Sequence, residues 1–194
     1  MSKGLIGVLV VGIIILFGGF WACNKRNSFV DKKVEAQKQW QNVESQYQRR
    51  MDLIPNIVAT VKGEANFEKS TLEAVVSARA SATQVKVNLD DMSDASIAKY
   101  KAAQGDLSNA LGRLLMVTEN YPNLKANAAF GDLRVTLEGC ENRISVERMK
   151  YNELSGDFNK AIQMFPGSLL AGSFPPLPYF EADKGAEKAP KVEL

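Results

Sequence analysis

Eight residues combine charged groups, amides and an unusual backbone position in two distant segments of the chain: Arg49, Arg50, Asp52, Pro55, Asn56, Arg143, Tyr151 and Asn152. Guanidinium, carboxylate and amide groups in this mixture suit ion pairing and hydrogen bonding, between helices or with a partner. One interpretation is ion pairing that fixes the register of neighbouring helices. The sharper hypothesis is an interaction patch, in which the two segments face each other across a helical bundle beside the proline.

Catalytic chemistry has little support in this sequence, because the chain contains no histidine. Histidine is the commonest general base and metal ligand. Its absence removes every Ser-His-Asp and Cys-His arrangement, and the Glu-x-x-His motif of di-iron bundles. There is also no P-loop and no GxGxxG turn. We therefore predict that the protein is not an enzyme and has no cofactor, no metal and no small-molecule substrate.

The charge balance limits the class of partner. The 194 residues include 24 basic and 22 acidic side chains, for a net charge of +2. Such a chain has no basic field to attract nucleic acid, which we do not expect as a partner. The two cysteines, Cys23 and Cys140, are too few for a disulfide framework and lie in different contexts.

A membrane anchor is predicted at the N-terminus. Residues 4–22 contain no charge, and as a helix they would span about 28 Å, close to the hydrocarbon thickness of a bilayer. Three interpretations remain open: a retained single-pass anchor, a lipoprotein signal ending in possible lipidation of Cys23, or a cleaved signal peptide. The basic residues that follow the apolar stretch favour a cytoplasmic domain, but exported proteins begin in a similar way, so the side of the membrane stays open.

Helical periodicity continues after the anchor. A first helix is predicted over residues 27–63, with an apolar face of Val30, Val34, Trp40, Val43, Tyr47, Met51, Ile54, Val58 and Val61. Pro55 lies inside it and removes one backbone hydrogen bond, which costs about 3 kcal/mol in a plain helix interior. Gly63 is a natural stop. The proline therefore indicates either strong packing or a functional kink.

Three further helices follow, with Ser93 or Asp94 as the expected N-cap of the second of them. Residues 66–87 carry a stripe of Phe67, Leu72, Val75, Val76 and Ala80. The next helix carries Ile97, Tyr100, Leu107, Leu111, Leu114 and Leu115. The last carries Phe130, Leu133, Leu137, Cys140, Ile144, Tyr151, Phe158, Ile162 and Phe165. The spacing of three and four residues is typical of left-handed helix packing.

These elements predict an all-α fold in three parts. Residues 1–26 form the anchor, and residues 27–165 form an antiparallel up-down bundle of four helices whose first and last members are long and coiled-coil-like. The long pair would extend past the short pair toward the membrane as an uncovered stalk. Residues 166–194 hold five of the seven prolines and form an extended tail. We expect the tail to pack along the bundle, and the alternatives are contact with the bilayer interface or with a partner.

Several segments resemble the LemA family of bacterial membrane-anchored helical proteins. They are RRMDLIPNIV from Arg49, LGRLLMVTENYPNLKAN from Leu111, ENRISVERMKYN from Glu141, FNKAIQMFP from Phe158 and PYFEADKGAEKAPKVEL from Pro178. The resemblance implies a bundle behind an N-terminal membrane helix, with no agreed molecular activity. It also implies a genomic context near membrane-bound metalloproteases.

Two classes of function fit these observations. The leading hypothesis is a membrane-anchored, non-enzymatic scaffold or interaction module that forms a homo-oligomer or binds another membrane protein. The alternative is a signalling or sensing component in which a kink at Pro55 relays strain between bilayer and bundle. An accessory to a membrane protease is a third hypothesis.

Overall fold

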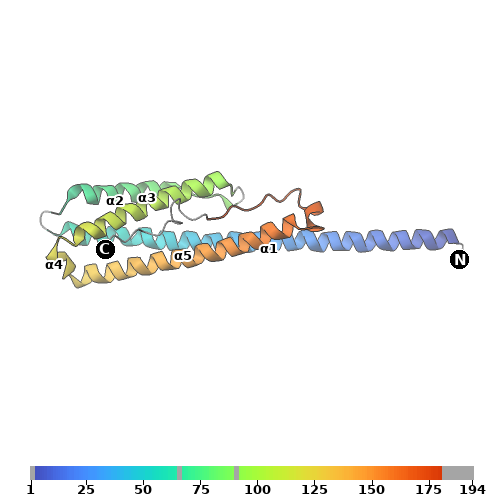
Figure 1. Ribbon diagram of the computed structural model, residues 1–194, viewed down its shortest axis with the longest axis horizontal. Coiled ribbons are helices and arrows are strands. Elements are labelled where there is room, and N and C mark those ends of the chain that lie inside the picture. Colours follow the sequence, from blue (N-terminus) through green and yellow to red (C-terminus); the bar gives the residue numbers. More distant parts are fainter. Residues whose placement is uncertain (1–2, 65–66, 90–91, 181–194) are drawn as a thin grey trace, which may run out of the picture.

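The computed structural model describes residues 3–64, 67–89 and 92–180, and every regular element in those ranges is a helix. The elements are α1 (Lys3–Lys62), α2 (Lys69–Gln84), α3 (Asp94–Thr118), α4 (Pro122–Lys125), α5 (Ala128–Gln163) and the short 3₁₀-helix η2 (Gly167–Leu170). α1, α2, α3 and α5 alternate in direction along one axis (Figure 1). The prediction of an all-α, up-down bundle is confirmed.

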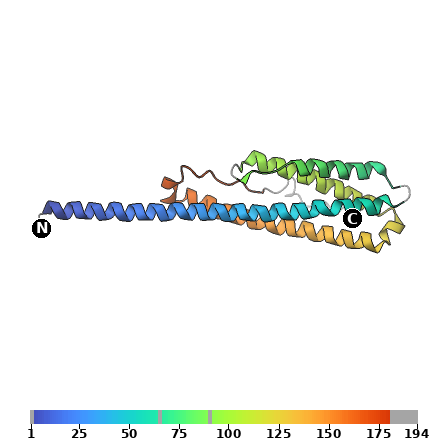
Figure 2. The same cartoon turned by 180° about the vertical axis from the view of Figure 1, so that it is seen from behind.

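α1 joins the apolar stretch to the bundle without interruption. It is 60 residues long, or about 90 Å at the usual helical rise. Asn27 and Ser28, where the predicted first helix of the bundle begins, lie inside this continuous helix. Large apolar side chains from Val8 to Phe20 are exposed, and this is the one helix in the described ranges long and apolar enough to cross a membrane. Only this part of α1 extends beyond the rest of the molecule (Figures 1 and 2).

α1 and α5 pack against each other along most of the bundle. From Ala36 onward one row of buried residues of α1 recurs at alternating steps of four and three: Ala36, Trp40, Val43, Tyr47, Arg50, Ile54, Ile57 and Val61. Gln39 and Met51 are buried beside this row. The α5 seam includes Phe130, Leu137, Cys140, Ile144, Tyr151 and Phe158, as expected. Together the two seams have the geometry of left-handed coiled-coil packing.

The predicted helix faces need correction at a few positions. Val30 and Val34 are exposed because the α1 seam begins one residue earlier, at Phe29, and continues at Ala36. Val76 is likewise exposed on α2, where Thr71 and Ala82 are buried instead. Phe165 lies beyond the end of α5 and is exposed. In each case the helical period was right, but the buried face was displaced by one or two residues or the helix ended sooner.

α2 and α3 form a shorter hairpin. It packs on the part of the α1–α5 pair that lies farther from the N-terminus. Ser93 is the N-cap of α3 in a capping box with Ser96, which confirms the predicted start. The buried residues of α3 keep a strict three–four alternation through Ile97, Tyr100, Gln104, Leu107, Leu111, Leu114 and Thr118. Two positions of this seam, Gln104 and Thr118, are polar.

The C-terminal segment covers the part of α1 and α5 that the hairpin leaves open. After η2 the chain runs extended and antiparallel to α5, burying Leu177 and Phe180. Phe29, Phe158 and Leu177 form a core cluster there, with Phe174 packed on it. The expectation that the tail packs along the bundle is confirmed for residues 166–180, and the prediction of an uncovered stalk is wrong. Residues 181–194 lie outside the described residues.

Two asparagines of α5 hold this tail by its backbone. The side chain of Asn159 donates to Leu177 O at 2.8 Å and accepts from Leu177 N at 2.7 Å. Asn152 makes the same pair of bonds with Phe180, both at 2.8 Å. Seven helical residues and three extended residues both span about 10 Å, so the two clamps match in spacing.

Candidate functional site

The most unusual feature of the bundle core is a buried arginine. Arg50 is only 1% exposed and occupies a seam position of α1, between Tyr47 and Ile54. A charged group in such a place requires partners, because burying an unpaired charge costs several kcal/mol. Its guanidinium carbon also lies 5.1 Å from the centre of the Tyr47 ring, a cation–π arrangement.

Polar partners for Arg50 come from the two facing helices. Nη1 donates to Ser108 Oγ of α3 at 2.5 Å and to the Glu141 carboxylate of α5 at 2.6 Å. Nη2 donates to the side-chain oxygen of Gln104 at 2.6 Å and to its backbone carbonyl at 3.1 Å. We call Arg50, Gln104, Ser108 and Glu141 the Arg50 cluster. It ties α1, α3 and α5 together at one level of the bundle.

A groove between α3 and α5 opens onto the Arg50 cluster. Its volume is about 750 Å³, and Tyr179 of the tail lies at its edge. The charged residues that line it are Arg50, Lys101, Arg148, Asp94, Asp106 and Glu141. Three basic and three acidic groups balance, so the groove does not select a ligand by the sign of its charge.

Pro55 creates a second polar contact between helices. A proline cannot donate to the carbonyl four residues earlier, which here is that of Met51. Nε of Arg79 on α2 donates to Met51 O at 3.0 Å and replaces the missing bond. α1 remains one unbroken helix through Pro55. The proline therefore provides an acceptor that attaches α2 to α1.

Three tyrosines surround Trp40 and the Arg50 cluster. The ring of Trp40 meets those of Tyr100 and Tyr151 edge-on and stacks on Phe180 at 5.3 Å. Burial raises the pKa of Tyr151 to about 12, and it also raises the pKa values of Tyr47 and Tyr100. These phenols remain neutral at physiological pH, and Tyr151 donates to the carbonyl of Pro178 at 3.0 Å.

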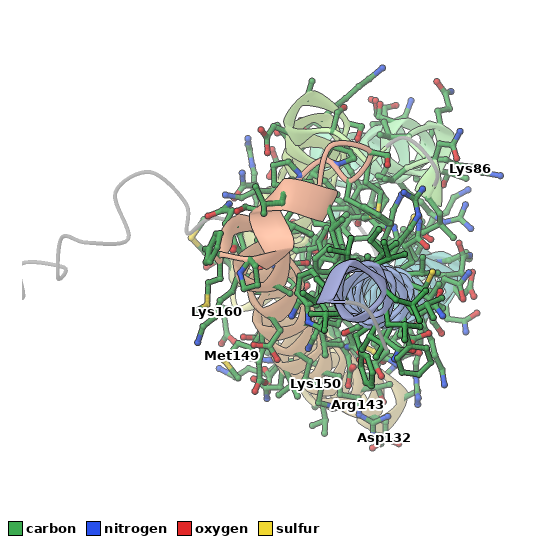
Figure 3. The ribbon with its side chains drawn as sticks, turned by 90° about the vertical axis from the view of Figure 1, so that its right-hand side faces the viewer. Lys86, Asp132, Arg143, Met149, Lys150 and Lys160 are labelled. Carbon is green, nitrogen blue, oxygen red and sulfur yellow. The ribbon has the colours of Figure 1, made fainter. Side chains whose placement is uncertain are left out.

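The eight residues of the hypothesised patch do not share one surface. Arg50 and Tyr151 are buried, and Asn152 is half-buried and bonded to the tail. The other five are exposed: Arg49, Asp52, Pro55, Asn56 and Arg143. Figure 3 shows Arg143 on the outer surface of the bundle, away from its interior. Arg50 is joined to Glu141 rather than to Arg143.

Several residues that complete these contacts were not anticipated: Gln104, Ser108, Glu141, Arg79 and Asn159. One of them, Gln104, carried a signal together with the anticipated Arg50. Gln104 continues the three–four alternation of α3, and Arg50 continues that of α1, so a polar pair at seam positions could have been proposed. Arg79 carried none, because its contact depends on how α2 lies beside α1.

The chemistry available at the Arg50 cluster is hydrogen bonding and ion pairing. Its members are an arginine and the amide, the hydroxyl and the carboxylate to which that arginine donates. No cluster of three or more potential metal ligands occurs within the described ranges. A polar group at a seam position commonly specifies register and partner at a cost in stability, and the cluster fits that use.

Cys23 and Cys140 are both free thiols in different surroundings. Cys140 is buried in the α5 seam, while Cys23 is exposed on α1 directly after the apolar stretch. That position is compatible with the lipidation hypothesis for Cys23, which stays a prediction.

The fold and the site define a class: all-helical proteins in which an exposed apolar helix continues into an antiparallel bundle whose helices are joined by buried polar contacts. Residues 39–194 match the LemA family, and the chain belongs to that family. The resemblance drawn from the sequence is thereby confirmed.

Curated relatives carry magnetosome names. Magnetosome proteins MamQ 1 and MamQ 2 of Paramagnetospirillum magneticum are each 27% identical to this chain over 190 residues, covering 88% of it and 70% of the relative. Magnetosome protein MamQ of Magnetospirillum gryphiswaldense is 28% identical over 162 residues, covering 75% of this chain and 60% of the relative. The similarity to MamQ and the apolar N-terminal helix support a bacterial membrane protein.

Proposed function

We propose that the protein is a membrane-anchored, non-enzymatic scaffold that associates with other copies of itself through the outer face of α5. The observation that carries this proposal is a stripe of exposed apolar side chains on that helix: Val135, Val146 and Met149. We call these three residues the α5 stripe.

The α5 stripe lies opposite the packed seam. Val135 and Val146 are about three helical turns apart, and Met149 follows within one more turn. Leu137 and Ile144, by contrast, are on the buried side. Met149 projects from the outer surface in Figure 3. An apolar stripe on an otherwise polar helix favours a helix-to-helix contact with a partner.

The length and continuity of α1 support a scaffold as well. One unbroken helix carries the apolar stretch and the first seam of the bundle, so the outer face of α5 keeps a fixed direction relative to the anchor. Copies anchored in the same bilayer would present the α5 stripe at the same height. Shared height raises the effective concentration of the surfaces.

Cross-linking in native membranes tests the proposal. The variants Val146→Cys and, as a control on the exposed face of α2, Ser77→Cys would each be made with Cys23→Ser. We expect a cross-linked dimer for Val146→Cys and little for Ser77→Cys. A full-length protein that is strictly monomeric in detergent and captures no neighbour in membranes would contradict the scaffold.

A relay through Pro55 is the second proposed function, and the Arg79 contact favours it. Any bending of α1 at Pro55 would change the position of Met51 O and hence of α2. Replacement of Pro55 by alanine separates the two functions. Loss of function in a bundle that is more stable would support the relay, while unchanged function would favour the scaffold.

The third proposed function is that of an accessory to a membrane protease, and capture of partners in the same membranes tests it. A pull-down that recovers a membrane metalloprotease, together with loss of its activity when this chain is deleted, would support an accessory role. Recovery of this chain alone would favour self-association. Protease accessibility of the bundle in the same vesicles would establish the side of the membrane.

A further inference from the structure

The segment that runs from the end of α5 through η2 exposes three large apolar side chains. Met164, Phe165 and Leu169 are 56%, 79% and 73% exposed, and they lie within six residues of one another. We call these three residues the apolar turn. Scattered single apolar residues on a surface are ordinary, but a group at one end of a rod-shaped molecule suggests a contact.

The apolar turn lies beside the end of the apolar stretch of α1. Gly167 of η2 lies close against α1. A Cβ atom added at Gly167 would be 3.1 Å from the Phe29 ring and 3.3 Å from the Lys25 side chain. Lys25 follows Ala22 by three residues, or about 4.5 Å along the helix. The turn is therefore at the level where the hydrocarbon core of a bilayer would end.

The remainder of the fold stops at this level. In Figure 1 η2 is the part outside α1 that reaches furthest toward the N-terminal end, and beyond it α1 continues alone. Figure 3, viewed along the axis from that end, shows η2 in front, beside α1. Nothing among the described residues lies between the turn and the plane that a membrane around residues 4–22 would occupy.

Basic and aromatic residues mark the same level. The ammonium of Lys25 lies 5.7 Å from the centre of the Phe29 ring, and the guanidinium of Arg26 lies 5.6 Å from that of Phe174. Trp21, which lies about one helical turn closer to the N-terminus than Lys25, is exposed. Cations and tryptophan are enriched where a helix leaves the hydrocarbon core for the headgroups.

We propose that the apolar turn inserts into the lipid surface and forms a second membrane contact beside α1. The occupant is the bilayer itself, because the turn continues the surface of the apolar helix at the depth of its basic border. This inference rests on the membrane anchor of the proposed function. Its consequence is a two-point attachment, which restrains both the tilt of the bundle and its rotation about α1.

Lipid-quenching measurements on the full chain test this attachment. An environment-sensitive fluorophore would be placed at Leu169→Cys or Met164→Cys with Cys23→Ser, since Cys140 is buried. The protein would be reconstituted in vesicles whose lipids carry a quencher on the acyl chain close to the headgroup. Val10→Cys in the apolar stretch would serve as the positive control.

Val135→Cys supplies the matched negative control. Val135 is 69% exposed on the same helix, and it precedes Met164 by 29 residues, or about 44 Å along α5. We expect lipid quenching at Leu169 and Met164 that is several times the quenching at Val135, and clear quenching at Val10.

Each result has a defined meaning. Quenching at Val10 but none at Leu169 and Met164 would contradict the proposed membrane contact of the apolar turn and would still support the anchor. No quenching at Val10 would overturn both. A cross-link between Leu169→Cys residues of two copies, without lipid quenching, would assign the turn to a protein contact and overturn the proposal.

Discussion

At the scale of single residues, two adjacent arginines have opposite roles. Arg49 is exposed, whereas Arg50 is buried among Gln104, Ser108 and Glu141. Their types and neighbours in the sequence do not separate them. The separation follows from the helical period, which directs residue 50 into the seam with Tyr47 and Ile54.

Replacement of Arg50 by alanine should destabilise the bundle by about 3 kcal/mol or more, because it leaves a cavity and several buried polar groups without a donor. Arg49→Ala is the matched control and should change the free energy of unfolding by less than about 0.5 kcal/mol. Chemical denaturation followed by circular dichroism measures both. Equal effects of the two substitutions would contradict the assigned role of Arg50.

Arg50→Leu separates stability from register. Leucine fills part of the cavity but leaves Gln104, Ser108 and Glu141 without their donor, so we expect a loss of stability that is smaller than for alanine but still clear. We also expect a loss of specificity: broader spectra, or alternative association of the helices, seen by size-exclusion chromatography and amide NMR. A bundle as uniform as the wild type would contradict a register function.

At the scale of elements, the contact between α1 and α2 depends on a missing hydrogen bond. Pro55 has no N–H to donate to Met51 O, and Nε of Arg79 donates to this oxygen instead. With Pro55→Ala the helix can restore its own bond, so Arg79 becomes less important. The loss of stability on Arg79→Ala, about 1 kcal/mol in the wild type, should then shrink in the Pro55→Ala background. A double-mutant cycle measures this, and additive effects would contradict the coupling.

The tail is a second element whose place is set by contacts across the fold. Asn152→Ala removes two hydrogen bonds to Phe180 and should cost about 1–3 kcal/mol. Release of Phe180 would expose Trp40, so the tryptophan emission should shift to longer wavelength. The Trp21→Phe background removes the other indole, and Asn142→Ala on the exposed face of α5 is the control. An unchanged emission for Asn152→Ala would show that the clamp does not hold the tail.

At the scale of the whole molecule, the buried tyrosines predict loss of stability in alkali. Burial raises the pKa of Tyr151 to about 12 in the folded state, and it raises those of Tyr47 and Tyr100 above the ordinary value near 10. Above about pH 10 the unfolded chain therefore loses protons that the folded chain keeps, and stability falls as the pH rises. Below that pH this contribution is fully present.

Denaturation curves at several pH values between 8 and 12 measure this effect. The free energy of unfolding should decline from about pH 10 upward, and less steeply in Tyr100→Phe, which keeps the ring but removes the ionising group. Tyr121, which is only half-buried, supplies the control Tyr121→Phe. Stability that is independent of pH up to 12 would contradict the burial of these phenols.

The sequence by itself determined the helices, their order and the apolar N-terminal stretch. Periodicity is a local property, so Ser93, Gly63 and the three–four spacing of α5 predicted boundaries and a seam that the structure confirms. The family could also be recognised, because it rests on short segments of residues.

Only the tertiary structure decided which face each helix buries and which polar groups meet. The seam of α1 begins at Phe29 rather than Val30, and the path of the tail depends on asparagines of α5. Burial of Arg50 is favourable only because Gln104, Ser108 and Glu141 arrive from two other helices. Such partners are far apart in sequence, and their meeting depends on packing energies summed over the whole fold rather than on local pattern.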